Sequence, residues 1–281
     1  MTGKQIATPL PAQSRSTQAM MLWTLLALLL PVAARVVVVG VQVLFSVATA
    51  LVIGVLCDAV VAQLPKRSLR ESLVGSSAIT AVLVALCIPP ATPWWLTASS
   101  IVFAIVLGKQ AFGGLGRNLL NPAMLGYALV LVLFPKDIER ALTLKSHSLH
   151  AGEWLAIADV CGGLLLIGLR VVRWQVPLAF CIGVLLTALA FGKGVPDIWP
   201  TLVIGNALLA AFFIASDPVT GCASARGRWL FGFGAGALLN TFGQFQGVLD
   251  PLPFAILAMN AVAPFIDHHL RSRRAGQPQH G

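Results

Sequence analysis

Long apolar runs follow one another through this chain, and few charges interrupt them. Of its 281 residues, 57% are hydrophobic and only 10% are charged. A soluble domain carries charge on about a quarter of its residues, so this chain has too little charge to cover a surface in water. The sequence therefore predicts a polytopic membrane protein. Residues 1–19 are polar and precede a long apolar run, so we expect a retained first helix and no cleavable signal peptide.

The apolar runs divide into about ten predicted membrane spans, all of them helical. A helix needs about 20 apolar residues to cross a bilayer. On this measure the spans are 20–38, 41–63, 73–89, 94–110, 121–134, 154–172, 176–191, 199–215, 228–242 and 251–267. Each half of the chain then holds an odd number of spans, so the second half enters the membrane from the opposite side. This arrangement favours two inverted five-helix repeats.

The predicted organisation has three parts. A polar cytoplasmic segment at 1–19 precedes a transmembrane domain at 20–267, and a basic cytoplasmic tail follows at 268–281. Within the transmembrane domain, repeat one covers 20–135, an outer loop covers 136–153 and repeat two covers 154–267.

The basic residues give these spans an orientation. With the amino terminus in the cytoplasm, 14 of the 19 Lys and Arg residues fall on the cytoplasmic side, as the positive-inside rule requires. They are Lys4, Arg15, Lys66, Arg67, Arg70, Lys109, Arg117, Arg170, Arg173, Arg226, Arg228, Arg271, Arg273 and Arg274. The net charge of +9 therefore reflects topology and not a surface for nucleic acid. The arginines of the tail suit anionic lipid headgroups.

Two stretches break the apolar pattern at corresponding places in the two halves. Gly108–Tyr127 contains four glycines in its first nine residues and then Asn121-Pro122, which a regular helix does not continue through. Ser216–Gly232 begins with Asp217-Pro218. Broken backbone at membrane depth is tolerated where it is buried in protein or lines a cavity. The pair predicts a binding site between the repeats, and the alternative is that each stretch is an ordinary loop between helices.

Cysteine and acidic residues give weaker signals. The five cysteines lie far apart without a CxxC pair or a histidine at zinc spacing, which argues against a metal or cluster held by this chain alone. Asp58 and Asp159 lie inside predicted spans, where acids are costly and usually functional. We expect them to handle ions or to pair with arginine or hydroxyl groups near the interfaces.

Four stretches together resemble one family. GKQAFGGLGRNLLNPAMLGY, SDPVT with the following RGRWLFG, FAILAMNAVAPFID and IPPATPWWL are similar to the D subunit of the Rnf ion-translocating electron-transport complex and to the B subunit of sodium-translocating NADH:quinone oxidoreductase. The matches run in order from about Asp58 to Asp267. The resemblance implies a ten-helix fold akin to urea and ammonium transporters. It also implies a multi-pass subunit of the bacterial inner membrane, within a flavin-containing complex that couples electron transfer to Na⁺ or H⁺ transport.

The resemblance directs attention to six residues in the two breaks. The amides of Gly113 and Gly114 are expected to approach an anion or the polar edge of a flavin, FMN or riboflavin, held without a covalent bond. Asn118, Asn121 and Thr220 add neutral hydrogen-bonding groups. The Asp217 carboxylate is expected either to cap the start of a half-helix or to handle an ion. Close helix packing is the alternative role of the glycines. Trp154 is expected to anchor at the membrane interface, with stacking on a flavin as its alternative.

The family's covalent FMN site has no counterpart here. Rnf D subunits typically attach FMN to the threonine of a Ser/Thr-Gly-Ala-Thr motif in the outer loop, and PKDIERALTLKSHSLHAGE at 135–153 contains no such motif. Thr143 is its nearest relic, so we expect no covalent FMN. A second departure is Gly75-Ser76-Ser77-Ala78, where the family tends to have Asp-Gly-Ser-Ala.

The predicted function is that of a membrane subunit without a complete active site of its own. The chain has no soluble domain to bind NADH or iron–sulfur clusters, so the other subunits of an Rnf-like translocase are required partners. The alternative is a stand-alone channel or transporter for a small solute with the same inverted-repeat core. A third possibility is a scaffold that has lost its redox function, which the short outer loop would allow.

Overall fold

The computed structural model describes residues 17–61, 75–112, 118–143, 149–203, 206–245 and 247–275, and every regular element within these ranges is helical. Gly113 and Gly114, two of the predicted site residues, lie outside the described residues. The helices of the first half of the chain are α1 (Thr17–Val39), α2 (Gln42–Val61), α4 (Ser76–Cys87), α5 (Trp94–Ile105), η1 (Val106–Gln110), α6 (Pro122–Leu133) and α7 (Pro135–Thr143).

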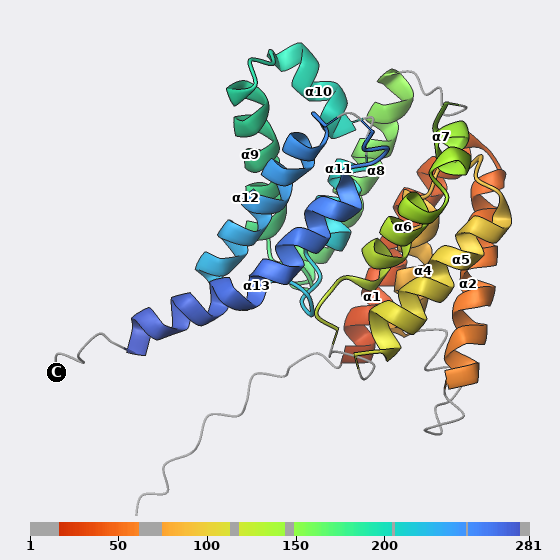
Figure 1. Cartoon of the computed structure of the whole chain (residues 1–281), viewed down its shortest axis with the longest axis horizontal. Helices are drawn as coiled ribbons and strands as arrows, with labels where there is room; N and C mark the ends of the chain where they lie inside the picture. Colours follow the sequence, from red (N-terminus) through yellow and green to blue (C-terminus); the bar gives the residue numbers. More distant parts are fainter. Residues whose placement is uncertain are drawn as a thin grey trace, which may run out of the picture.

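The second half continues with a comparable series. Its helices are α8 (Leu149–Gly168), α9 (Gln175–Ala190), α10 (Val195–Val203), α11 (Ala207–Leu209), η2 (Ala210–Ile214), α12 (Ala225–Phe242) and α13 (Leu252–Ala275). In Figure 1, α9, α12 and α13 lie on the left of the molecule and α2, α4, α5 and α6 lie on the right. Helix α1 packs against α8, so the two halves of the chain meet along this pair.

Among the described residues, three helices are long and apolar enough to cross a membrane alone: Thr17–Val39, Gln42–Val60 and His150–Gly168. The chain is therefore a membrane protein, and the large apolar side chains exposed on α1 and α2, such as Val37 and Phe45, suit contact with lipid. Shorter apolar helices run through Ser76–Cys87, Pro122–Leu133 and Gln175–Ala190. Each of the ten predicted intervals contains helical residues, and the number that cross the bilayer stays a prediction.

The described helices depart from the predicted intervals in three places. The outer loop contains helix α7 and the first residues of α8, which begins at Leu149, and the predicted tail continues α13 as far as Ala275. The interval 199–215 is divided among α10, α11 and η2. Helix α7 is short and amphipathic, with Ile138 and Ala141 buried, so a search for long apolar runs passes over it.

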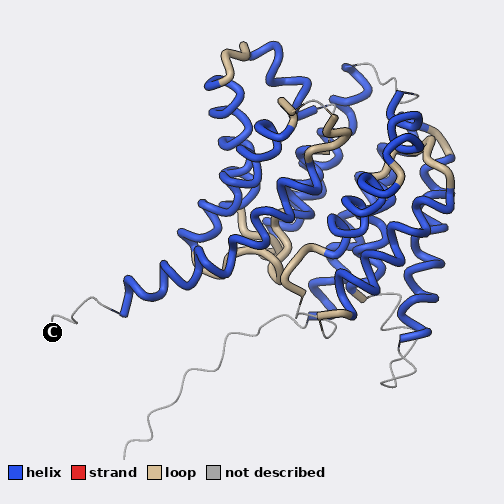
Figure 2. Tube along the Cα trace, in the orientation of Figure 1, coloured by secondary structure: helices blue, strands red, loops and turns tan. Residues whose placement is uncertain are grey.

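Close backbone contact holds α9 and α12 together. A Cβ atom on Gly236 of α12 would collide with the carbonyl oxygen of Phe180, and one on Gly183 of α9 would collide with that of Phe233. Glycine at these two positions lets the helix axes approach each other, as small residues do in membrane bundles. Figure 2 shows several loops gathered between the two groups of helices at the lower end of the view. These loops include the described non-helical residues 118–121 of the first break and 216–224 of the second.

Candidate functional site

A π-helical turn lies where each break begins: η1 includes the first residues of the first break, and η2 ends at Ile214, just before the second. In η1 the amide of Ala111 donates to the carbonyl of Val106 at 3.0 Å, and in η2 the amide of Ala215 donates to that of Ala210 at 2.7 Å. Both bonds span five residues, one more than an α-helix allows. Such wide turns are rare and often mark functional sites in helical proteins. The two halves of the chain therefore change backbone geometry in the same way where their breaks begin.

Asn121, in the first break, is the N-cap of α6. Its side-chain oxygen accepts a hydrogen bond from the amide of Met124 at 3.3 Å, and Pro122 occupies the first helical position. Asparagine at the N-cap and proline directly after it are favoured helix starts, because both suit amides that have no partner within the helix.

The first break is joined to the second by hydrogen bonds through Asn260 of α13. The backbone amide of Asn121 donates to Oδ1 of Asn260 at 2.9 Å, and Nδ2 of Asn260 donates to the carbonyl of Thr220 at 3.1 Å. Nδ2 of Asn121 also reaches the carbonyl of Ile214 at 3.5 Å. Asn121 and Asn260 are 3% and 1% exposed. Two predicted site residues, Asn121 and Thr220, are therefore brought close together by Asn260, which lies in a family-like motif but is not among the predicted site residues.

Asp217 organises the turn in which it lies. Its carboxylate accepts hydrogen bonds from the amide of Val219 at 3.1 Å and the hydroxyl of Thr220 at 3.0 Å. The expectation that Asp217 caps the next half-helix is wrong, because Ser224 is the N-cap of α12 and accepts from the amide of Gly227 at 3.0 Å. The aspartate lies seven positions too early to reach that helix start and closes a local turn.

Asp267 of α13 holds the start of α12 from the other side. Its carboxylate accepts from the amide of Ala223 at 2.8 Å and from the hydroxyl of Ser224 at 3.1 Å. A negative charge near the amino-terminal end of a helix is favourable. Helix α13 thus contacts the second break at two places, through Asn260 and through Asp267.

A cavity of about 170 Å³ lies between the two breaks, and we call it the break cavity. Polar side chains from both halves line it, among them the predicted residues Asn118, Asn121 and Asp217. Thr220 is not a lining residue and acts through its bond to Asp217. Apolar walls come from Met20, Met21, Phe212 and Phe213. Trp154 is exposed and is not among the residues that line this cavity, and its place at the membrane interface stays a prediction.

A buried cation, Lys109 of η1, also lines the break cavity. Its ammonium lies 3.6 Å from the carboxylate of Asp58 on α2 and donates a short hydrogen bond to the hydroxyl of Ser77. The side chain is buried, with Lys109 4% exposed. The charge pattern of the sequence predicts Lys109 among the cytoplasmic cations, so it is not among the predicted site residues. The expected partner of Asp58 was an arginine or a hydroxyl group, and the structure provides a lysine.

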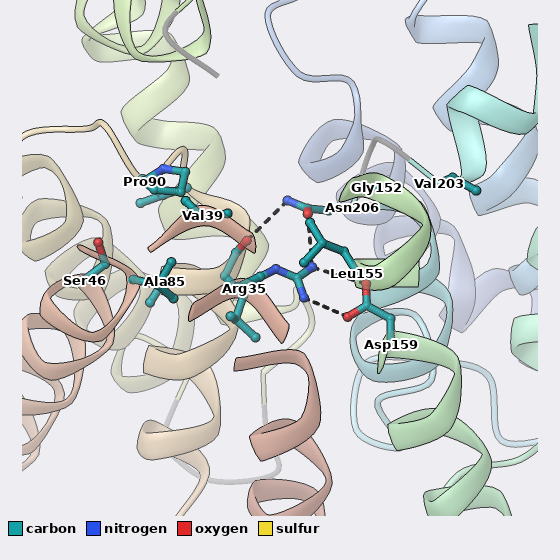
Figure 3. Close-up of a pocket in the computed structure, with 13 residues that line it drawn as sticks. Arg35, Val39, Ser46, Ala85, Pro90, Gly152, Leu155, Asp159, Val203 and Asn206 are labelled. Carbon is teal, nitrogen blue, oxygen red and sulfur yellow. Dashed lines mark hydrogen bonds and ion pairs between the residues drawn. The ribbon is translucent and has the colours of Figure 1, made fainter. Parts of the chain in front are cut away.

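A second, small cavity of about 30 Å³ holds a buried ion pair between the two halves, and we call it the Arg35 cavity. Arg35 of α1 and Asp159 of α8 point toward each other in Figure 3, joined by hydrogen bonds of 2.8 and 3.2 Å. Arg35 also donates to Oδ1 of Asn206 at 3.3 Å. Nδ2 of Asn206 reaches the carbonyls of Leu86 and Cys87 at the end of α4. Asp159 therefore has the arginine partner expected from the sequence.

The break cavity has the chemistry that suits a flat, partly polar ring. The carboxamides of Asn118 and Asn121 can both donate and accept hydrogen bonds, as the polar edge of a flavin requires. Phenylalanine and methionine walls suit the faces of such a ring. In the part of the chain that the structure describes, no group of three His, Cys, Asp or Glu side chains lies close enough to hold a metal ion. The residues present thus fit a flavin that is held by hydrogen bonds and packing.

Comparison with known proteins places the whole chain in one family. Residues 5–276 match the model of the NQR2, RnfD, RnfE family. Proteins named as the D subunits of ion-translocating oxidoreductase complexes are similar over nearly the full length. The one from Marinobacter nauticus is 30% identical, over 97% of this chain and 95% of the relative. The one from Ectopseudomonas mendocina is 33% identical over the same shares, and one from Pseudomonas aeruginosa is 34% identical over 83% and 84%. The chain therefore belongs to the NQR2, RnfD, RnfE family.

Proposed function

We propose that this chain is the D-type membrane subunit of an Rnf-like complex that couples electron transfer to ion translocation across the bacterial inner membrane. The observation that carries the proposal is the match to subunits of this name over 97% of the chain. The stand-alone solute channel is not favoured, because these relatives are named as parts of a complex. Partner subunits would supply the electrons.

The proposal includes ten spans in two inverted repeats, with both termini in the cytoplasm. It is supported by the two π-helical turns, since η1 and η2 each lie where a break begins in their half of the chain. It is supported also by the division of the break cavity between the halves, because Asn121 comes from one and Asp217 from the other. A site at the interface of two repeats, built from interrupted helices, is the arrangement typical of such folds.

A flavin, FMN or riboflavin, is the proposed non-covalent cofactor of the break cavity. When bound, it would accept electrons and pass them on. Asn118 and Asn121 would hold its polar edge by hydrogen bonds, and Phe212 and Phe213 would exclude water from its faces. Asn260 would act indirectly, as a positioning residue, because its side chain is hydrogen-bonded to the backbone of Asn121 and of Thr220. Buried positioning side chains that make two hydrogen bonds, as Asn260 does, keep such a site rigid.

Two measurements test the cofactor proposal. The chain, purified alone in lipid nanodiscs after growth with ample riboflavin, is expected to release a flavin on acid extraction. Asn121→Leu and Asp217→Leu are each expected to lower the flavin content and the activity of the assembled complex, at an unchanged amount of chain in the membrane. Absence of flavin from the purified unsubstituted chain would refute the cofactor and leave the family membership untouched. Loss of the chain itself in both variants would assign Asn121 and Asp217 to folding.

A further inference from the structure

The charged groups of the break cavity are distributed unevenly between its walls. Lys109 from the first half lines the cavity, and its partner Asp58 does not. Asp217 lines the cavity from the second half, with both carboxylate oxygens engaged by the turn that follows it. The wall formed by the first half therefore carries a positive charge nearest the cavity, and the wall formed by the second half carries a negative one.

The Lys109 ammonium is held in a defined place. It is fixed by the carboxylate of Asp58 at 3.6 Å and by the hydroxyl of Ser77. A fixed charge in a buried setting interacts with a neighbouring charge far more strongly than the same charge would in water, because the surrounding dielectric is low. Lys109 belongs to the π-helical turn η1, in which it is buried.

We propose that Lys109 makes the break cavity bind the reduced form of its electron-accepting ring more tightly than the oxidised form, with the ring's anionic end directed at Lys109. This inference rests on the proposed flavin. A flavin ring that takes up two electrons and one proton is left with one negative charge, located at its pyrimidine end. The electrons would come from a one-electron carrier in a partner subunit, and the proton from water. Charge placed near that end of the ring is one of the means by which a protein tunes a flavin.

The competing explanation is that Lys109 only neutralises Asp58. A protein loses much stability when one partner of a buried ion pair is removed alone, and less when both partners are replaced together. On that explanation the variants change how much folded protein is obtained and leave the relative affinity for the two redox forms unchanged. The two explanations therefore predict different values for one ratio, the affinity for the reduced form divided by the affinity for the oxidised form. This ratio does not depend on the yield of folded protein.

The experiment measures that ratio with riboflavin as the probe. The full chain in nanodiscs is titrated anaerobically with oxidised riboflavin and with riboflavin reduced by dithionite, and the two dissociation constants are compared. Lys109→Gln is expected to weaken binding of the reduced form relative to the oxidised form at least tenfold. This change corresponds to about 30 mV for a two-electron couple. Asp58→Asn, which leaves the ammonium without its counter-charge, is expected to shift the ratio in the opposite direction.

Two further variants keep the result interpretable. The double variant Lys109→Gln/Asp58→Asn carries neither charge, so it is expected to fold even if Lys109→Gln does not. Its ratio of affinities, reduced form over oxidised form, is expected to be lower than that of the unsubstituted chain. Thr24→Val changes an uncharged lining residue and is expected to alter the ratio less than twofold. Equal ratios in the unsubstituted chain and the double variant would refute the role of Lys109 while leaving flavin binding intact. If neither form of riboflavin binds the unsubstituted chain, the proposed cofactor fails, and this inference fails with it.

Discussion

The backbone amide of Asn121 donates a hydrogen bond of 2.9 Å to the side-chain oxygen of Asn260, which lies 139 residues away in the sequence. The same carboxamide donates to the carbonyl of Thr220. One side chain on α13 thus satisfies a donor of the first break and an acceptor of the second. A buried polar group left without a partner costs about 1–3 kcal/mol, so this bridge holds both interrupted segments in place.

Replacing Asn260 by leucine is expected to destabilise the chain, because the amide of Asn121 and the carbonyl of Thr220 would both lose a buried partner. The loss is about 1–3 kcal/mol for each group, and it is measured as a lower midpoint of thermal unfolding in detergent by fluorescence-detected size-exclusion chromatography. Phe265→Leu on the same helix is the control, since Phe265 is 74% exposed. An Asn260→Leu midpoint equal to that of the control would show that the bridge contributes nothing.

The Arg35–Asp159 pair is expected to behave as a buried ion pair between the halves. Arg35→Met alone would leave the Asp159 carboxylate buried beside Asn206 without its cation, at a cost of about 3–5 kcal/mol. The double variant Arg35→Met/Asp159→Leu removes both charges and should recover most of the lost thermal stability. The same unfolding measurement compares the three proteins. A double variant no more stable than Arg35→Met would mean that the contacts of Asn206, and not the charges, hold this region together.

Local signals in the sequence predict some elements well. Long apolar runs predict α1, α2 and α8, and Asn121-Pro122 predicts a helix start that the structure places at Pro122. The sequence predicts an arginine or hydroxyl partner for Asp159 but does not identify Arg35, because the two residues lie 124 positions apart. Asn260 is missing from the predicted site, although a single asparagine in an apolar span is itself a sign of function. Lys109 is predicted only as a cytoplasmic cation at the end of the span 94–110, and nothing in the local sequence indicates the π-helical turn to which it belongs.

The contact between α9 and α12 is expected to fail with a larger residue at Gly236. A Cβ atom there would collide with the carbonyl of Phe180 and lie 3.0 Å from the amide nitrogen of Val184, so Gly236→Val should force the helices apart. Overpacking typically costs about 1–3 kcal/mol. Gly168→Ala is the matched control, because a Cβ atom at Gly168 has no neighbour within 4 Å. Equal midpoints of unfolding for the two variants would contradict the tight packing of these helices.

The orientation of the chain is tested with reporters that are active on one side of the membrane only. Fusions after Arg70 and at the carboxyl-terminal end should report the cytoplasm, and a fusion after Thr143, where α7 ends, should report the periplasm. These outcomes follow from the placement of the basic residues. A periplasmic carboxyl terminus would require an odd number of spans and would overturn the inverted repeat.

The last prediction is that the chain carries no covalent FMN. A phosphoester needs a threonine hydroxyl in a sequence that the transferase recognises, and the segment 135–153 contains no Gly-Ala-Thr. Thr143 is preceded by the bulky Leu142, and its hydroxyl donates to the carbonyl of Arg140 at 2.8 Å at the end of α7. Denaturing gels of cells that also express the transferase should therefore show no flavin fluorescence at the 29.6 kDa position of this chain. Thr143→Val serves as the control. A fluorescent band that is present in the unsubstituted chain and absent from Thr143→Val would show that α7 presents a degenerate attachment site, and that covalent flavin is retained without the motif.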